Sequence, residues 1–203
     1  MATGVYKLEE MNMDNQPTRP GSDVRPLPGN AISYRKASVL LLLYLRADEH
    51  YVIFTRRTDM VEHHKGQISL PGGSRDHDDP DDVYTALREA QEELGLDPAL
   101  VEVIATLRDV YVPVSSFVIT PVVARIKHAM LEREIVFRPN PDEVAELIEV
   151  PLSALRDEAI HRTELRTVNG ITHTIHYYNY GPYEIWGATG RIIYEFLSAN
   201  VES

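Results

Sequence analysis

One short segment constrains this chain more than any other, because it combines a helical pattern with an unusual density of carboxylates. Acidic residues at Asp81 and Asp82 suit the positive end of a helix dipole, and Gly95 supplies a C-terminal stop. The sequence therefore predicts a helix over residues 81–94. Such a helix must dock by one face while its charged face stays at the surface.

Three carboxylates occupy one sector of this helix. At about 100° per residue, Glu89, Glu92 and Glu93 fall within roughly one third of the circumference. The apolar face is centred roughly 120° away and consists of Val83, Ala86, Leu87, Ala90 and Leu94. The carboxylates therefore flank the buried face, so they can border a groove while the helix stays docked.

Such a group of acids favours a bound cation. Like charges one helical turn apart are mildly destabilising, and a divalent cation would remove that repulsion. Mg²⁺ prefers oxygen ligands and shares its coordination shell with substrate phosphates, so Glu89, Glu92 and Glu93 are candidate ligands for Mg²⁺ or Mn²⁺. Arg88 lies four residues before Glu92 and could hold it by a bidentate contact. The acidic side of such a helix can also be an ordinary solvated surface, so the surrounding motif must decide between a solvated surface and a metal site.

The remaining pattern predicts strands with few helices. Strands are expected at residues 38–44, 51–55, 101–111, 117–127, 135–137, 163–168 and 172–178. Turns or short helical pieces are expected over residues 143–148 and 152–156. Asn169-Gly170 is a strong hairpin signal, and Gly187–Ala199 has the pattern of an amphipathic helix.

These elements predict an α/β or α+β sandwich, in which a mixed β-sheet carries helices on its faces. Residues 1–33 contain several prolines and glycines and little apolar periodicity, which indicates an irregular N-terminal arm. Residues 34–203 are then one domain.

Composition excludes several classes of protein. The net charge of −11 argues against a general nucleic-acid binder, and no apolar run reaches the roughly 18 residues of a membrane span. The absence of cysteine excludes disulfides, thiolate metal sites and cysteine nucleophiles. The N-terminus does not resemble a secretion signal, so a cytoplasmic protein is expected. Residues 51–75 are nevertheless locally basic, which suits a small anionic substrate.

Residues 88–96, preceded by Pro71-Gly72-Gly73, closely resemble the Nudix box. That box runs Gly, five residues, Glu, seven residues, and then Arg-Glu-(aliphatic)-x-Glu-Glu-x-Gly-(aliphatic). The second half matches at every specified position. In the first half one extra residue follows Gly73, so that Pro80 occupies the position of the first Glu, with several aspartates nearby. The resemblance implies a Nudix-type α/β/α sandwich with a mixed β-sheet and a catalytic loop–helix–loop.

A second resemblance narrows the substrate. Residues 55–58 and 64–73 look like the segment before the box in coenzyme A pyrophosphatases, and the likeness covers about residues 34–198. Departures are Glu62 where a basic residue is common, Leu70 for the usual Phe, and Gly190 where Ala is usual. The resemblance implies metal-dependent cleavage of coenzyme A or an acyl-CoA to 3′,5′-ADP and 4′-phosphopantetheine. It is also compatible with a homodimer.

The two resemblances imply roles for particular residues. Arg88, Glu92, Glu93 and Glu143 would be catalytic, with Glu93, Glu143 or Glu146 as the general base. The substrate would meet Arg56, Arg57, Lys65, Gly72 and Gly73. For the basic residues the alternative is an exposed loop, and Tyr183 and Trp186 suit packing better than a nucleobase platform.

Two other functions remain open at this stage. ADP-ribose or another nucleoside diphosphate derivative could be the substrate, because specificity lies in loops outside the box. A Nudix-like domain could also bind a nucleotide as a regulator without cleaving it. In each case the partner is a small nucleotide, and neither a nucleic acid nor a membrane is expected.

Overall fold

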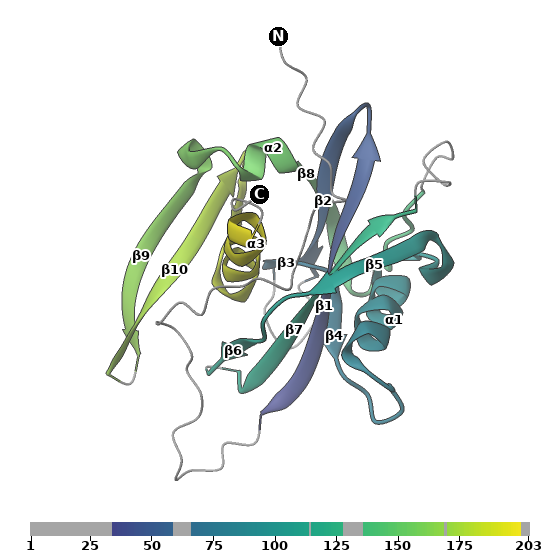
Figure 1. Cartoon of the computed structure of the whole chain (residues 1–203), viewed down its shortest axis with the longest axis horizontal. Helices are drawn as coiled ribbons and strands as arrows, with labels where there is room; N and C mark the ends of the chain where they lie inside the picture. Colours follow the sequence, from purple (N-terminus) through teal and green to yellow (C-terminus); the bar gives the residue numbers. More distant parts are fainter. Residues whose placement is uncertain (1–33, 59–65, 114, 128–135, 169, 200–203) are drawn as a thin grey trace.

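The computed structural model describes residues 34–58, 66–113, 115–127, 136–168 and 170–199. The expected N-terminal arm and Lys65 lie outside these ranges. The described chain forms two β-sheets and the helices that pack on them (Figure 1).

The larger sheet comprises β1 (Arg35–Arg46), β2 (Glu49–Arg57), β3 (Ile68–Ser69), β4 (Gly72–Ser74), β5 (Val101–Thr106), β6 (Val110–Val112), β7 (Phe117–Ile126) and β8 (Val144–Pro151). Its main path is β3-β2-β1-β7-β5, with β4 paired to β1, β6 to β7 and β8 to β2. Because β1 and β7 are parallel while β1 and β2 are antiparallel, the sheet is mixed, as predicted.

The smaller sheet has the order β11-β10-β9 and comprises β9 (His161–Val168), β10 (Ile171–Tyr180) and β11 (Tyr183–Ile185). The helices are α1 (Asp82–Leu94), α2 (Leu152–Leu155) and α3 (Gly187–Ala199), with 3-10 turns at η2 (Pro98–Leu100) and η4 (Glu158–Ile160). Helix α1 covers one face of the larger sheet, and α3 lies between that sheet and β10 (Figure 1).

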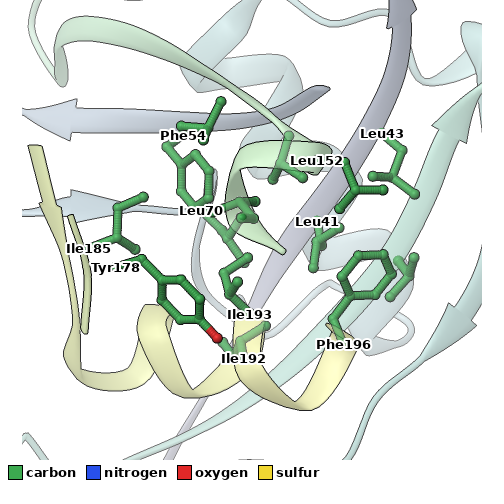
Figure 2. Close-up of a cluster of buried hydrophobic side chains, with 14 of the residues drawn as sticks. Leu41, Leu43, Phe54, Leu70, Leu152, Tyr178, Ile185, Ile192, Ile193 and Phe196 are labelled. Carbon is green, nitrogen blue, oxygen red and sulfur yellow. The ribbon is translucent and has the colours of Figure 1, made fainter. Parts of the chain in front are cut away.

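Alternation along β1 supplies both halves of the core, because successive side chains of a strand point to opposite faces. Leu40 and Leu42 pack with the buried face of α1. Leu41 and Leu43 pack on the other face, with Phe196 of α3 among their neighbours (Figure 2). The sandwich is therefore held by a central strand that is buried on both sides.

Several predicted elements are confirmed, notably the first hairpin, α1, the pairing of β9 with β10 and α3. The prediction of turns or helical pieces at residues 143–148 was wrong for residues 144–148, which lie in β8. Its acidic residues obscured an alternating pattern, and pairing with β2 satisfies its backbone. The strand expected over residues 101–111 is divided into β5 and β6, and the described residues of 135–137 form no strand.

Candidate active site

Helix α1 has well-formed ends that fix the position of its acids. Asp81 caps the N-terminus, its side chain accepting a hydrogen bond of 2.7 Å from the backbone N–H of Tyr84. Gly95 ends the helix in the left-handed conformation, with φ of 64°. The buried side of the helix includes Ala86 and Ala90, together with the carboxylate of Glu93.

Two glycines bring strand β4 against the helix. A Cβ on Gly73 would lie 2.4 Å from Oε2 of Glu89, and a Cβ on Gly72 would lie 2.3 Å from the carbonyl oxygen of Ser38. Gly72 has a backbone φ of 151°, a value that residues other than glycine rarely adopt. Its N–H donates to Oε2 of Glu93 over 3.2 Å. The close approach of β4 to Glu89 and Glu93 therefore requires both glycines.

Glu93 is the most buried of the three helix acids, with 3% of its side chain exposed, and Nη1 of Arg57 lies 3.5 Å from its Oε1. Burial raises the pKa of Glu93 to about 7; the Gly72 hydrogen bond and the charge of Arg57 oppose this shift, and the charges of Glu89 and Glu143 add to it. Burial also raises the pKa of Glu89. These carboxylates therefore share one region of concentrated negative charge.

Glu143 approaches this region from the loop before β8. The backbone N–H of Thr58 donates to its carbonyl oxygen over 3.0 Å, and the Thr58 hydroxyl donates to the carbonyl oxygen of Asp142. Asn140 N–H bonds the carbonyl oxygen of Glu93 over 2.9 Å. These contacts tie the loop to the end of α1, and the carboxylate of Glu143 raises the pKa of both Glu89 and Glu93.

Arg88 binds its acidic neighbours differently from the prediction. Its contact with Glu92 is a single bond of 3.1 Å, whereas the bidentate contact is made with Asp79, over 3.0 Å from both Nε and Nη2. Nη2 also lies 2.9 Å from Oε1 of Glu89 and donates to the carbonyl oxygen of Ser74. The guanidinium therefore joins the β4 loop to the acids of α1.

Asp79 is a site residue that motif counting missed. Its side chain is 3% exposed and also accepts hydrogen bonds from the Thr85 hydroxyl and the Asp76 N–H, each over 2.9 Å. Hydrogen bonds from Arg88 hold the pKa of this carboxylate well below its usual range. The box expects its first acid eight residues before Arg88, at Pro80. Because this chain has one extra residue after Gly73, the acid stands nine residues before Arg88, at Asp79.

Arg56 and Glu146 form a separate group at the opposite face of β2 and β8. Nε of Arg56 donates to Glu146 over 2.9 Å, and the Tyr183 hydroxyl donates to the same carboxylate over 2.6 Å. These hydrogen bonds lower the pKa of Glu146 and occupy its carboxylate, which makes it a poor general base. Trp186 stacks on Tyr177, with ring centroids 5.9 Å apart, in keeping with packing.

The donor set suits a hard cation, since Glu89, Glu92, Glu93 and Glu143 offer only oxygen. Among the described residues, no three acidic or histidine side chains converge on one point. Arg88 engages both Glu89 and Glu92, and Glu92 is 53% exposed and can rotate. A cation at this helix would therefore compete with the guanidinium for the same oxygens.

Comparisons with known proteins agree with this geometry. A sequence model of the NUDIX domain matches residues 34–168. The chain therefore belongs to the NUDIX domain family, and the predicted family is confirmed.

The relatives are spread over several kingdoms. The peroxisomal coenzyme A diphosphatase NUDT7 of Mus musculus is 38% identical over 149 residues, which are 73% of this chain and 61% of the relative. Nudix hydrolase 15, mitochondrial, of Arabidopsis thaliana is 35% identical and covers 83% of this chain and 59% of the relative. The uncharacterized Nudix hydrolase NudL of Klebsiella pneumoniae is 34% identical, covering 85% and 86%.

The chain spans 53% to 61% of the length of the plant and mouse relatives it matches. Among solved structures, a MutT/nudix family protein from Enterococcus faecalis has a TM-score of 0.55 at 19% identity, covering 86% of this chain and 64% of that one. This likeness shows the fold. No helix within the described ranges is long and apolar enough to cross a membrane.

Proposed function

We propose that this chain is a divalent-metal-dependent pyrophosphohydrolase that cleaves coenzyme A or an acyl-CoA to 3′,5′-ADP and 4′-phosphopantetheine. The observation that carries the proposal is the buried Glu93, held between Gly72 and Arg57 and coupled to Glu89 and Glu143. The coenzyme A diphosphatase of the mouse, 38% identical, supports the choice of substrate.

In this proposal Glu89, Glu92 and Glu93 hold Mg²⁺ or Mn²⁺. A bound cation supplies charge neutralisation of the pyrophosphate and lowers the pKa of a coordinated water. Arg88 and Asp79 act by position, because they fix the acids relative to the β4 loop. Gly72 and Gly73 keep the backbone close to the acids, because a Cβ on Gly73 would displace Glu89 and a Cβ on Gly72 would meet the backbone of β1.

Glu143 is the candidate general base. It approaches Glu89 and Glu93 from outside the helix, and nothing in the described chain ties its carboxylate as Arg56 and Tyr183 tie that of Glu146. In-line attack of water on one phosphorus needs a group that accepts the proton of the water as the bridging oxygen leaves. Glu143 would take that proton.

Basic residues beside the acids would bind the polyphosphate. Arg57 already lies at Glu93 and would turn toward the negative charge that develops on the substrate. Arg56 is the second candidate, although Glu146 holds its Nε in this conformation. Lys65 lies outside the described residues, and we propose that it also contacts the substrate. A cytoplasmic location also remains a prediction, while the names of relatives include mitochondrial, chloroplastic and peroxisomal proteins.

The test is to incubate the purified protein with coenzyme A and, separately, with ADP-ribose, each with Mg²⁺ or Mn²⁺, and to separate the products by chromatography. The proposal predicts metal-dependent release of 3′,5′-ADP from coenzyme A, with ADP-ribose largely intact. Cleavage of ADP-ribose alone would retain a pyrophosphohydrolase but overturn the substrate. If neither compound is cleaved, a nucleotide-binding regulator becomes the better account.

A further inference from the structure

Strand β9 lies at the outer edge of the smaller sheet, away from the candidate active site (Figure 1). Residues 162–167 are all exposed. Within the described part of the chain, β10 is the strand paired with β9, and no other strand covers its outer edge. An unpaired edge offers a row of backbone donors and acceptors to another strand.

This edge lacks one common device against pairing, a β-bulge. The register of β9 with β10 continues without interruption from Val168 opposite Ile171 to His161 opposite Tyr178. Strand β5 also lies at a sheet edge, but its register shifts between Val103 and Ala105. Such a bulge bends a strand and hinders edge pairing, so β9 is the better edge for addition of a strand.

The sequence of β9 is self-complementary about Leu165. It reads Thr163-Glu164-Leu165-Arg166-Thr167. In an antiparallel pair of two copies centred on Leu165, this residue faces itself and each Glu164 faces Arg166 of the second copy. Registers centred on Glu164 or on Arg166 would instead oppose like charges, which destabilises a pair of strands.

We infer that β9 pairs antiparallel with β9 of a second copy of this chain, so that one sheet runs through a two-fold dimer. Charged residues normally keep an edge strand single, but here their order favours an identical partner. The dimer has the closed, isologous symmetry that is commonest among homo-oligomers.

The charged side chains are already held in place on one face of β9. Glu164 contacts both Arg162 and Arg166, and Nη2 of Arg166 lies 2.7 Å from the hydroxyl of Tyr177. A carboxylate has about four acceptor positions and a guanidinium five N–H donors. These internal contacts therefore leave capacity for the second copy and reduce the conformational freedom lost on pairing.

Leu165 is the residue that reports on this interface. Its side chain is 74% exposed and lies on the opposite face of the strand from Glu164 and Arg166. A change at this position therefore leaves the ion pairs and the fold of one copy intact. Because Leu165 faces itself across the two-fold axis, any charge introduced there meets a like charge.

The experiment is sedimentation velocity on the full chain and its Leu165→Lys and Leu165→Glu variants. We expect a concentration-dependent dimer for the unchanged chain and monomers for each variant alone. An equimolar mixture of the two variants should restore a dimer, because the introduced lysine would then face the introduced glutamate. Val103→Lys, at the half-exposed edge of β5, is the matched control and should remain dimeric.

Three results would overturn the inference: a monomeric unchanged chain at all concentrations, dimers in both single variants, or no dimer in the mixture. Melting temperatures equal to that of the unchanged chain would confirm that the variants fold. None of these readings depends on turnover, so they stand or fall separately from the proposed hydrolysis.

A cross-link gives a second test, because the chain contains no cysteine. Directly opposed residues of antiparallel strands have Cα atoms about 4.5–5.5 Å apart, which is within the range that a disulfide spans. In a glutathione redox buffer, Leu165→Cys should form a covalent dimer and Val103→Cys should not. Equal cross-linking of the two variants, or none at position 165, would contradict the proposed register.

Discussion

Asp79 organises the loop before α1 through charge and hydrogen bonding. It accepts a bidentate contact from Arg88, a hydrogen bond from Thr85 and a third from the Asp76 N–H. A neutral amide in its place would leave Arg88 without its main counter-charge. Since Arg88 also contacts Glu89 and Glu92, the orientation of these acids depends on Asp79.

Replacement of Asp79 by Asn should therefore lower both stability and activity. We expect a melting temperature several degrees lower, and a fall in turnover of about 10–100-fold, the usual effect of losing a group that orients metal ligands. Differential scanning fluorimetry and initial rates measure the two effects. Asp78→Asn, at an exposed neighbour, is the control. If the two variants behave alike, Asp79 does not have this role.

Individual residues also show where sequence reasoning was sufficient. The grouping of Glu89, Glu92 and Glu93 follows from helical periodicity alone, and the structure retains it. The partner of Arg88 depends on the path of residues 74–80, which folds back over the helix. Local spacing gave Glu92 as the bidentate partner, whereas tertiary contacts select Asp79.

At the scale of elements, α3 packs unusually closely on β10. A Cβ on Gly190 would lie 2.3 Å from the carbonyl oxygen of His176 and 3.3 Å from that of Ile185. Because the nearest atoms are backbone, a side chain at this position would force the helix away from the strand. This proximity accompanies the stacking of Tyr194 on His176, with ring centroids 3.9 Å apart.

Gly190→Ala should consequently destabilise the protein, although alanine favours helices. We expect a loss of about 1–3 kcal/mol in the free energy of unfolding, as for other overpacked sites, measured by urea denaturation. Ser198→Ala, on an exposed position of the same helix, should be neutral or slightly stabilising. A stability gain at Gly190 would show that the helix can move outward without cost.

Two histidines join the hairpin to α3 through neutral rings. Nε2 of His161 and Nδ1 of His176 are 3.0 Å apart, and the rings stack on Tyr178 and Tyr194. Burial lowers the pKa of His176 to about 4, and the positive charges of His161 and Arg191 act in the same direction. Burial also lowers the pKa of His161.

This pair should make stability depend on pH. In the unfolded chain histidine titrates near about pH 6.5, so below that pH the unfolded state binds more protons than the folded state. The stabilisation is complete above about pH 6.5 and is lost as the pH falls toward 4. For His176 the loss is at most about 3 kcal/mol. Urea unfolding at pH 7 and 4.5 should show a smaller difference for His176→Gln; an unchanged difference would contradict the assignment.

The elements also show which sequence signals were reliable. The hairpin signal between β9 and β10 and the amphipathic pattern of Gly187–Ala199 depend on local geometry; the two strands pair and α3 forms, as predicted. Strand β8 was misread because Glu146 and Glu149 interrupt its apolar pattern. Glu146 binds Arg56 across the β2–β8 pair at 2.9 Å, and Glu149 binds Arg46 at the end of β1 at 2.5 Å. Long-range pairing of this kind has no local signature.

For the whole molecule, the net charge of −11 is distributed so that a basic segment lies beside an acidic helix. Residue Arg57, at the end of β2, meets Glu93 because α1 packs beside β1 and β4. Sequence alone indicated both charged segments, but only the mixed sheet brings them together. The proposed function therefore depends above all on a cation bound by Glu89, Glu92 and Glu93.

The most direct measurement is the rate of 3′,5′-ADP release from coenzyme A, with Mg²⁺ and with a chelator, for the unchanged chain, Glu93→Gln and Glu102→Gln. Glu93→Gln preserves volume and should reduce the metal-dependent rate by more than the roughly 10–100-fold expected for a group that only orients metal ligands, while the protein stays folded. Glu102→Gln, at an exposed site on β5, should retain full activity. Undiminished turnover in Glu93→Gln, or in chelator, would contradict the account.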